Sequence, residues 1–249
     1  MTDFKDHFSP QSDDYAKYRP GYPSMLFEVI LDHVNDFDLA WDCATGNGQA
    51  ARALAPHFRK VIATDASEKQ IANANPIPNV EFMVSSAEKT PFLDRSFDLI
   101  TVAQAAHWFD MPAFYREVKR VIKPGGILAM WTYTLFETVP KINRIIEEFY
   151  FEVVYKYWPP ERRLVEAGYS TLYFPFDPIK VPKFYMHLSW NYEEMIGYLN
   201  TWSSVKNYRQ EKHEDPIDLV DGKLQAVWGN PETRYRLKWE IPMLVTRIG

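Results

Sequence analysis

Up to residue 135 the chain alternates between short apolar runs and segments whose apolar residues recur at helical spacing. A short apolar run bounded by turn-forming residues predicts a buried strand, and apolar residues three and four positions apart predict an amphipathic helix. The predicted strands are residues 38–44, 60–65, 80–85, 97–105 and 124–134. The predicted helices are 22–34, with Ser24 as a capping candidate, 48–58, 67–75, with Ser67 as its cap, and 111–123.

After residue 135 the pattern is less regular and richer in aromatic residues. It predicts helices 138–158, 191–212 and 215–229, a proline-punctuated loop over 173–184, and strands 184–190 and 234–248. Strands that alternate with helices form parallel sheets covered by helices on both faces. We therefore expect an α/β fold, in which a Rossmann-like, doubly wound sheet of seven mostly parallel strands carries a helical cap.

No low-complexity linker or internal repeat divides the chain, so we expect a single domain over residues 1–249. Within it, residues 1–37 would form an N-terminal lid and the first helices. Residues 38–135 would form the ligand-binding core, and residues 136–249 the cap together with the last strands.

Glycine is scarce, with ten among 249 residues, yet Gly46 and Gly48 lie two positions apart directly after the first predicted strand. Glycine tolerates positive φ and close backbone approach, so this spacing predicts a turn shaped around a ligand. Ligands of doubly wound sheets bind beyond the carboxyl ends of the strands, where the strand order reverses. Asp65, the pair 87–88 and the segment 104–107 follow other strands, so we expect these segments to meet in one crevice.

Charge and cysteine content narrow the possible partners. The net charge is −5 and no run of lysine and arginine occurs, so we expect neither nucleic acid nor a membrane surface as partner. The single cysteine, Cys43, excludes an intramolecular disulfide, and the histidines show no ligand spacing, so no metal site is expected. With no apolar signal core or long apolar run, we expect a cytoplasmic monomer or homodimer that acts on a small molecule.

Two ligands are compatible with the glycine turn. Residues 46–51 fit the dinucleotide pattern G-x-G-x-x-[G/A], and Asp65 follows about twenty residues later. Asp42 argues against a dinucleotide, because its carboxylate would face the pyrophosphate, and like charges at ~4 Å repel by roughly 4 kcal/mol at an effective dielectric near 20. S-adenosylmethionine instead offers positive charge to Asp42 and a ribose to Asp65.

The motifs occur in the order found in class I S-adenosylmethionine-dependent methyltransferases, which the chain resembles. They are D-x-A-x-G-x-G at 42–48, the acid at 65, SSAEKTPF at 85–92, FDLI at 97–100 and VIKPGGIL at 121–128. Within this class, YAKYRPGYP at 15–23, AAHWFD at 105–110 and NTWSS at 200–204 resemble the trans-aconitate methyltransferase-like branch. The chain departs from the class at Ala44, where a glycine is usual, so the turn is less permissive there.

The resemblance implies which residues bind the cofactor. Tyr18 and Arg19 would fold over it, with Arg19 on its carboxylate. Gln104 would lie under its methionine part or its methyl group. The other implied binding residues are Asp42, Ala44, Gly46 and Gly48 at the turn, Asp65, Ala66 and Gln70 around the ribose, and Ala87 and Glu88 at the adenine edge.

His107 and Gln104 are the candidate catalytic residues. His107 is the only histidine at a predicted strand end, and histidine titrates near neutral pH, so it could act as a general base. Alternatively, His107 shapes the pocket. The sequence offers no acid placed to orient it as a base, which favours this second interpretation.

Methyl transfer from S-adenosylmethionine requires mainly that acceptor, methyl and sulfur be aligned. A carboxylate acceptor needs no base at neutral pH, and the branch resemblance also indicates O-methylation of a small carboxylic acid. Arg162, Arg163, Arg209 and Arg234 are candidates for holding further acid groups. The alternatives are O- or N-methylation of a larger aromatic metabolite, with His107 as base, and a protein that binds S-adenosylmethionine without transferring its methyl.

Overall fold

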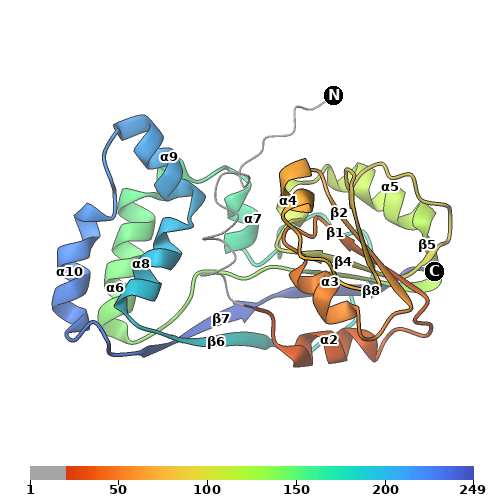
Figure 1. The fold of residues 1–249 in the computed structure, drawn as a ribbon, viewed down its shortest axis with the longest axis horizontal. Helices are drawn as coiled ribbons and strands as arrows, with labels where there is room; N and C mark the ends of the chain where they lie inside the picture. The colour runs from red at the N-terminus through yellow and green to blue at the C-terminus, as the bar shows by residue number, and fades with distance from the viewer. Residues whose placement is uncertain (1–20) are drawn as a thin grey trace.

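The computed structural model describes residues 21–249, which form two lobes side by side (Figure 1). The core lobe contains a six-stranded sheet in the order β3-β2-β1-β4-β5-β8. Its first five strands are parallel, and β8 runs antiparallel to β5 at the edge. The strands are β1 (Leu39–Cys43), β2 (Lys60–Asp65), β3 (Val80–Val84), β4 (Phe97–Ala103), β5 (Ile122–Trp131) and β8 (Met243–Arg247).

The central strands are buried on both faces, because helices cover each side of the sheet. Alternate residues of a strand point to opposite faces, so Ala40 and Trp41 of β1 belong to different apolar clusters. The Ala40 cluster includes residues of α2 (Ser24–Leu31) and α3 (Gln49–Leu54), and the Trp41 cluster includes residues of α5 (Met111–Val121). Helix α4 (Glu68–Ala72) follows β2.

The second lobe is the cap. Its two strands, β6 (Phe184–Trp190) and β7 (Tyr235–Ile241), form an antiparallel pair of their own. The Ala40 cluster continues from the sheet into the cap, where it includes Tyr198 and Trp239. The other cap elements are α6 (Pro140–Glu148), the π-turn η3 (Phe149–Val153), the 3₁₀ turn η4 (Tyr155–Tyr157), α7 (Arg162–Glu166), α8 (Tyr192–Asn200), α9 (Ser203–Lys212) and α10 (Asp218–Trp228).

The expected α/β fold, with a mostly parallel doubly wound sheet, is confirmed, but the number of strands in that sheet differs. Among the described residues it has six strands, because β6 and β7 pair with each other in the cap. The single strand predicted over 234–248 is divided at Pro242 into β7 and β8. Proline has no N–H to donate to a neighbouring strand, and the chain passes there from the cap pair into the main sheet.

Three local predictions have different outcomes. Ser24 is the first residue of α2 and not its cap, since the N-cap position is held by Pro23 without a side-chain bond. Ser67 does cap α4, accepting a hydrogen bond from the N–H of Gln70 at 3.3 Å. The α-helix predicted over 138–158 ends at Glu148, where the chain widens into the π-turn η3 and then tightens into the 3₁₀ turn η4.

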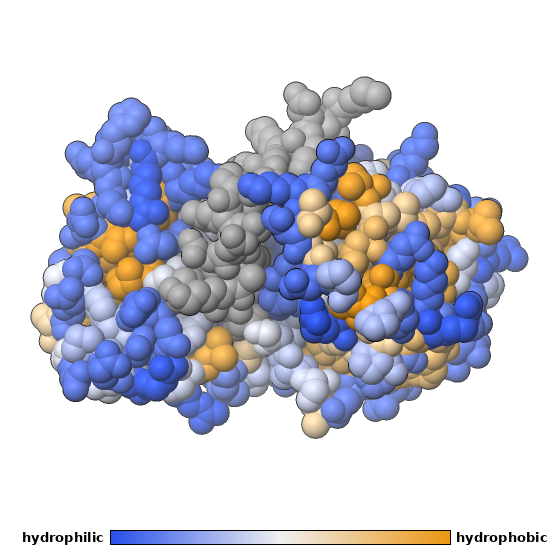
Figure 2. Space-filling model, viewed as in Figure 1, coloured by the Kyte–Doolittle hydropathy of each residue, from blue (hydrophilic) through white to orange (hydrophobic). Residues whose placement is uncertain are grey.

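Figure 2 shows how apolar and polar residues among 21–249 are distributed over one face of the molecule. Apolar residues gather there in separate areas over the cap and over the core, each bordered by polar residues. Within residues 21–249, no helix is both long and apolar enough to cross a membrane.

Candidate active site

The carboxyl ends of the parallel strands bring most of the predicted site residues to one edge of the sheet. Strands β1 and β4 are neighbours although two strands separate them in sequence, so the strand order reverses between them. Doubly wound sheets bind their ligands at such a reversal. Burial raises the pKa of the Cys43 thiol in β1, and the negative charges of Asp42, Glu88 and Asp65 raise it further. These three acids, from separate segments, therefore lie around the end of β1.

The turn after β1 contains three residues with left-handed backbone. Ala44, Gly46 and Gly48 have φ angles of 54°, 56° and 83°. A Cβ on Gly48 would lie 3.0 Å from the Phe82 ring, so the turn packs closely against β3. No atom of residues 21–249 lies within 4 Å of the place that a Cβ on Gly46 would take, so this described part of the chain leaves space beside Gly46. Ala44 adopts the conformation that favours glycine at a cost of roughly 1–2 kcal/mol, as its departure from the class pattern suggested.

Asp42 lies beneath this turn with no exposed surface. Its Oδ2 accepts hydrogen bonds from the Thr45 hydroxyl at 2.5 Å and the Ala51 N–H at 3.0 Å. Its Oδ1 accepts one from the Thr101 hydroxyl at 2.9 Å. Burial raises the pKa of Asp42 to about 6, although these hydrogen bonds lower it. Asp42 therefore ties the turn to α3 and β4, and its direct contact with a cofactor stays a prediction.

Asp65 ends β2 and lies half-buried beside the glycine turn. Its Oδ2 accepts a hydrogen bond from the N–H of Gly46 at 2.9 Å, and its Oδ1 accepts one from the N–H of Ser67 at 2.9 Å. These two bonds fix the carboxylate next to the open side of the turn. Ala66 and Gln70 lie beside it at the start of α4, and the ribose contacts of all three residues stay predictions.

The loop between β3 and β4 holds the predicted adenine-edge residues. Ala87 is buried. Glu88 is half-buried, and its Oε1 accepts a hydrogen bond from the N–H of Asp110, the N-cap of α5, at 3.2 Å. The structure thus places both residues at the strand-end edge, and their contact with an adenine stays a prediction.

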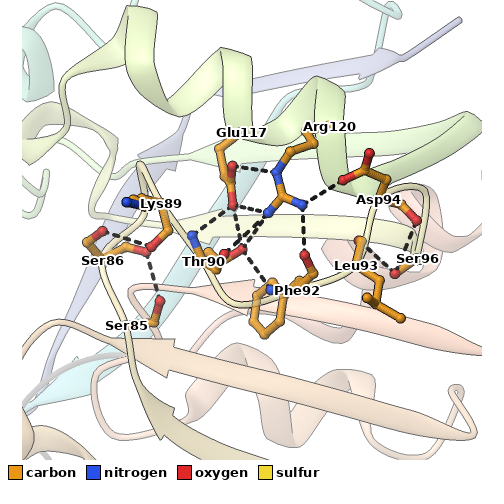
Figure 3. Close-up of polar contacts among 10 residues, drawn as sticks. All are labelled: Ser85, Ser86, Lys89, Thr90, Phe92, Leu93, Asp94, Ser96, Glu117 and Arg120. Carbon is orange, nitrogen blue, oxygen red and sulfur yellow. Dashed lines mark hydrogen bonds and ion pairs between the residues drawn. The ribbon is translucent and has the colours of Figure 1, made fainter.

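A polar network that sequence reasoning missed anchors this loop to α5 (Figure 3). Arg120 donates to Glu117 at 2.6 Å, to Asp94 at 2.7 Å and to the carbonyl oxygen of Phe92 at 2.7 Å. Glu117 also accepts from the N–H of Thr90 at 2.8 Å. The three-residue spacing of Glu117 and Arg120 on a predicted helix was the available signal, because such residues are neighbours on its surface.

Gln104 follows β4 with a φ of 57°. Its Oε1 accepts hydrogen bonds from the Thr132 hydroxyl at 2.5 Å and the Tyr133 N–H at 2.8 Å. Its Nε2 donates to the Tyr133 carbonyl oxygen at 3.5 Å. The side-chain amide therefore links the ends of β4 and β5, and a role beside the methyl group stays a prediction.

His107 lies in the 3₁₀ turn η2 (Ala106–Trp108) and is 9% exposed. Its Nδ1 is 3.0 Å from the hydroxyl oxygen of Tyr169, a residue that no sequence pattern links to it. Burial, together with the positive charge of Arg162, lowers the pKa of His107 to about 3. The lowered pKa makes the ring a weak proton acceptor, and its Nδ1 already has a tyrosine as partner, which favours the pocket-shaping interpretation over that of a general base.

Two further predictions concern residues and groups elsewhere. Tyr18 and Arg19, proposed to fold over the cofactor, lie outside the described residues. Over residues 21–249, no group of three or more histidine, cysteine, aspartate or glutamate side chains is arranged to hold a metal ion.

The residues at this edge fit S-adenosylmethionine better than a dinucleotide. Three carboxylates surround the end of β1, where a pyrophosphate would meet like charge and a sulfonium or ammonium would meet opposite charge. Residues 21–249 leave space beside Gly46 for a ligand. Asp65, fixed by two backbone N–H groups, presents an acceptor for ribose hydroxyls.

Comparison with known proteins places methyltransferases among the relatives of this chain. A model described as a methyltransferase domain matches residues 41–130, the segment that holds the glycine turn, Asp65 and His107. A proposed methyltransferase of Dictyostelium discoideum is 37% identical over 223 residues, covering 88% of this chain and 85% of that protein. The malonyl-[acyl-carrier protein] O-methyltransferase of Marinomonas sp. is 31% identical over 146 residues, covering 56% of this chain and 53% of that protein.

The similarity extends to a solved structure. A proposed type II methyltransferase from Anaeromyxobacter dehalogenans has 37% sequence identity and a TM-score of 0.86, covering 92% of this chain and 98% of that one. The likeness therefore includes the cap as well as the core sheet.

Proposed function

Because the chain belongs to the family of S-adenosylmethionine-dependent methyltransferases, we propose that it methylates a carboxylate oxygen of a small acid. S-adenosylmethionine is the methyl donor and supplies a methyl group already activated on a cationic sulfur. The protein must then bind the acceptor in line with that methyl and keep water out. Among the proposed cofactor contacts, Asp65 and the turn around Gly46 would hold the donor at the sheet edge.

The observation that carries this proposal is the state of His107. A hydroxyl or amine acceptor must lose a proton, which a nearby base would accept. His107 is the histidine at the strand ends, but it is buried against Tyr169 and its pKa is about 3. A carboxylic acid, with a pKa near 4, is already ionised at neutral pH. A carboxylate acceptor is thus the class that this site can methylate without a base.

Two comparisons support the same acceptor class. The Marinomonas relative is named for O-methylation of a malonyl group, which bears a carboxylate. The motifs at 15–23, 105–110 and 200–204 support placing the chain in the trans-aconitate methyltransferase-like branch. We extend to this chain only the acceptor class, a small carboxylic acid.

The alternative acceptor, a larger aromatic metabolite stacked in the cap, has less support. The aromatic rings of the cap contact one another: the centroid of Trp158 lies 5.5 Å from that of Tyr150 and 5.7 Å from that of Trp202. Rings packed in this way have less face available for a stacked ligand.

Incubation with methyl-labelled S-adenosylmethionine and a panel of acids, phenols and amines tests the proposal. We expect label in products that release methanol in mild base, as methyl esters do, and no label in phenols or amines. Asp65→Ala is the matched negative control, since it removes the proposed ribose acceptor. Label found only in base-stable ethers or methylamines would contradict the carboxylate acceptor.

A further inference from the structure

We propose that Arg162 binds a second carboxylate of the acceptor, one that is not methylated, so that the preferred acceptor carries at least two acid groups. This inference rests on the proposed carboxyl O-methylation and names the residue that would select the substrate.

Arg162 is the first residue of α7, which lies between the cap helices and the core lobe (Figure 1). Helix α7 packs against η2, the turn that follows β4 and holds His107. The positive charge of Arg162 reaches this turn, because it lowers the pKa of His107. The guanidinium therefore lies on the side of the cap that faces the strand-end edge.

The protein holds this guanidinium in one orientation. Its Nε donates to the Tyr150 hydroxyl at 2.9 Å, and that hydroxyl in turn donates to Glu166 at 2.5 Å. Its Cζ lies 4.5 Å from the centroid of the Trp158 ring. Stacking on an aromatic ring and a bond through Nε leave the edge with the two terminal nitrogens for a partner, and this edge matches the two oxygens of a carboxylate.

That edge has no acceptor within the described part of the chain. No aspartate or glutamate of residues 21–249 forms an ion pair with Arg162, and neither terminal nitrogen has a hydrogen bond to these residues. The indole Nε1 of Trp158 is also buried without a partner in residues 21–249. A half-buried guanidinium whose terminal nitrogens have no acceptor among these residues is an arrangement that an anionic ligand would complete.

The other three candidate arginines either form ion pairs within the protein or are exposed to solvent. Arg209 forms an ion pair with Asp215 at 2.7 Å, and Arg234 forms one with Glu194 at 2.8 Å. Arg163 is exposed. The contacts therefore rank Arg162 first among the four arginines that the sequence left equivalent.

Arg162 suits a carboxylate other than the reacting one. A bidentate arginine engages both oxygens of its partner and stabilises their negative charge, which would make the same group a weaker nucleophile toward the methyl. A carboxylate could also come from the methionine part of the cofactor, and the measurements below separate these two sources.

The test compares Arg162→Gln with Arg163→Gln, its exposed neighbour, on a dicarboxylic acid and on the monomethyl ester of the same acid. For Arg162→Gln we expect KM for the diacid to rise roughly 10- to 100-fold, with little change for the monoester. Arg163→Gln should behave as the wild type. S-adenosylhomocysteine affinity, measured by calorimetry, should stay within about threefold in both variants, and circular dichroism reports independently that they are folded.

Three results would overturn the proposal. Equal losses on diacid and monoester would show that Arg162 does not bind a second acid group. Weakened S-adenosylhomocysteine binding in a folded Arg162→Gln would assign the residue to the cofactor. A wild type that uses monoesters as well as diacids would contradict it without any variant, whereas failure to methylate any acid would instead refute the proposed function.

Discussion

Asp42, the penultimate residue of β1, and Asp65, the last residue of the neighbouring β2, are two register positions apart, yet their surroundings differ. Asp42 is enclosed by donors of the protein, so its charge serves the turn. Asp65 takes two backbone N–H groups at the sheet edge and remains half-buried. Motif spacing predicted that both aspartates bind the ligand, because it indicates that they lie near strand ends. It does not indicate which groups of the protein surround each carboxylate.

Replacing Asp42 with asparagine should make stability less sensitive to pH. Folding raises the pKa of Asp42 from 3.8 to about 6, so the stabilisation is present below pH 3.8 and is lost as the pH rises through about 6. The asparagine of Asp42→Asn still offers an oxygen that can accept the hydrogen bond from the Ala51 N–H, but it has no carboxyl group that titrates. Between about pH 4 and 7 it should gain on the order of 2–3 kcal/mol in unfolding free energy relative to the wild type.

Urea unfolding at the two pH values measures this gain. Asp36→Asn is the control, because Asp36 is exposed, and its offset from the wild type should not change with pH. A constant offset for Asp42→Asn as well would show that the buried carboxylate does not titrate as the structure indicates.

At the scale of elements, the glycine turn could be predicted from the sequence, but the different roles of Gly46 and Gly48 within it could not. Two glycines behind a strand indicate a ligand-shaped turn, and the structure has one there with positive φ. Only the packing shows that a larger residue at position 48 would press against the Phe82 ring, whereas residues 21–249 leave space beside Gly46. The Phe82 contact joins residues of β3 and the turn, which no local pattern connects.

Alanine at the two glycines should therefore have different consequences. Gly48→Ala would push against the Phe82 ring and should lose about 1–3 kcal/mol of stability. Gly46→Ala should lose only about 1 kcal/mol, from its positive φ, but its methyl would enter the open space and weaken S-adenosylmethionine binding at least roughly tenfold. Urea unfolding and calorimetry measure the two effects, and wild-type affinity in Gly46→Ala would place the cofactor elsewhere.

At the scale of the whole molecule, hydrophobic periodicity predicted the fold class and most elements, but not how the cap joins the core. The sequence pattern did not predict that β6 and β7 pair apart from the main sheet, because these two strands are far apart in sequence and Pro242 divides the last predicted strand. Tyr169 reaches His107, and Arg162 approaches it, from α7 and the turn beyond it. Such contacts between lobes depend on tertiary packing, so His107 alone could be identified in advance and its partners could not.

The dependence of methyl-transfer rate on pH, in the wild type and in His107→Asn, distinguishes a carboxylate acceptor from one that needs His107 as a base. A carboxylate acceptor is ionised above a pKa near 4, and His107, with a pKa of about 3, is uncharged throughout. We expect a flat rate between about pH 6 and 8.5 and appreciable activity in the variant. A rate that climbs through a pKa near 6.5, with a limb that disappears in His107→Asn and a loss of about 10²–10⁴-fold, would contradict it.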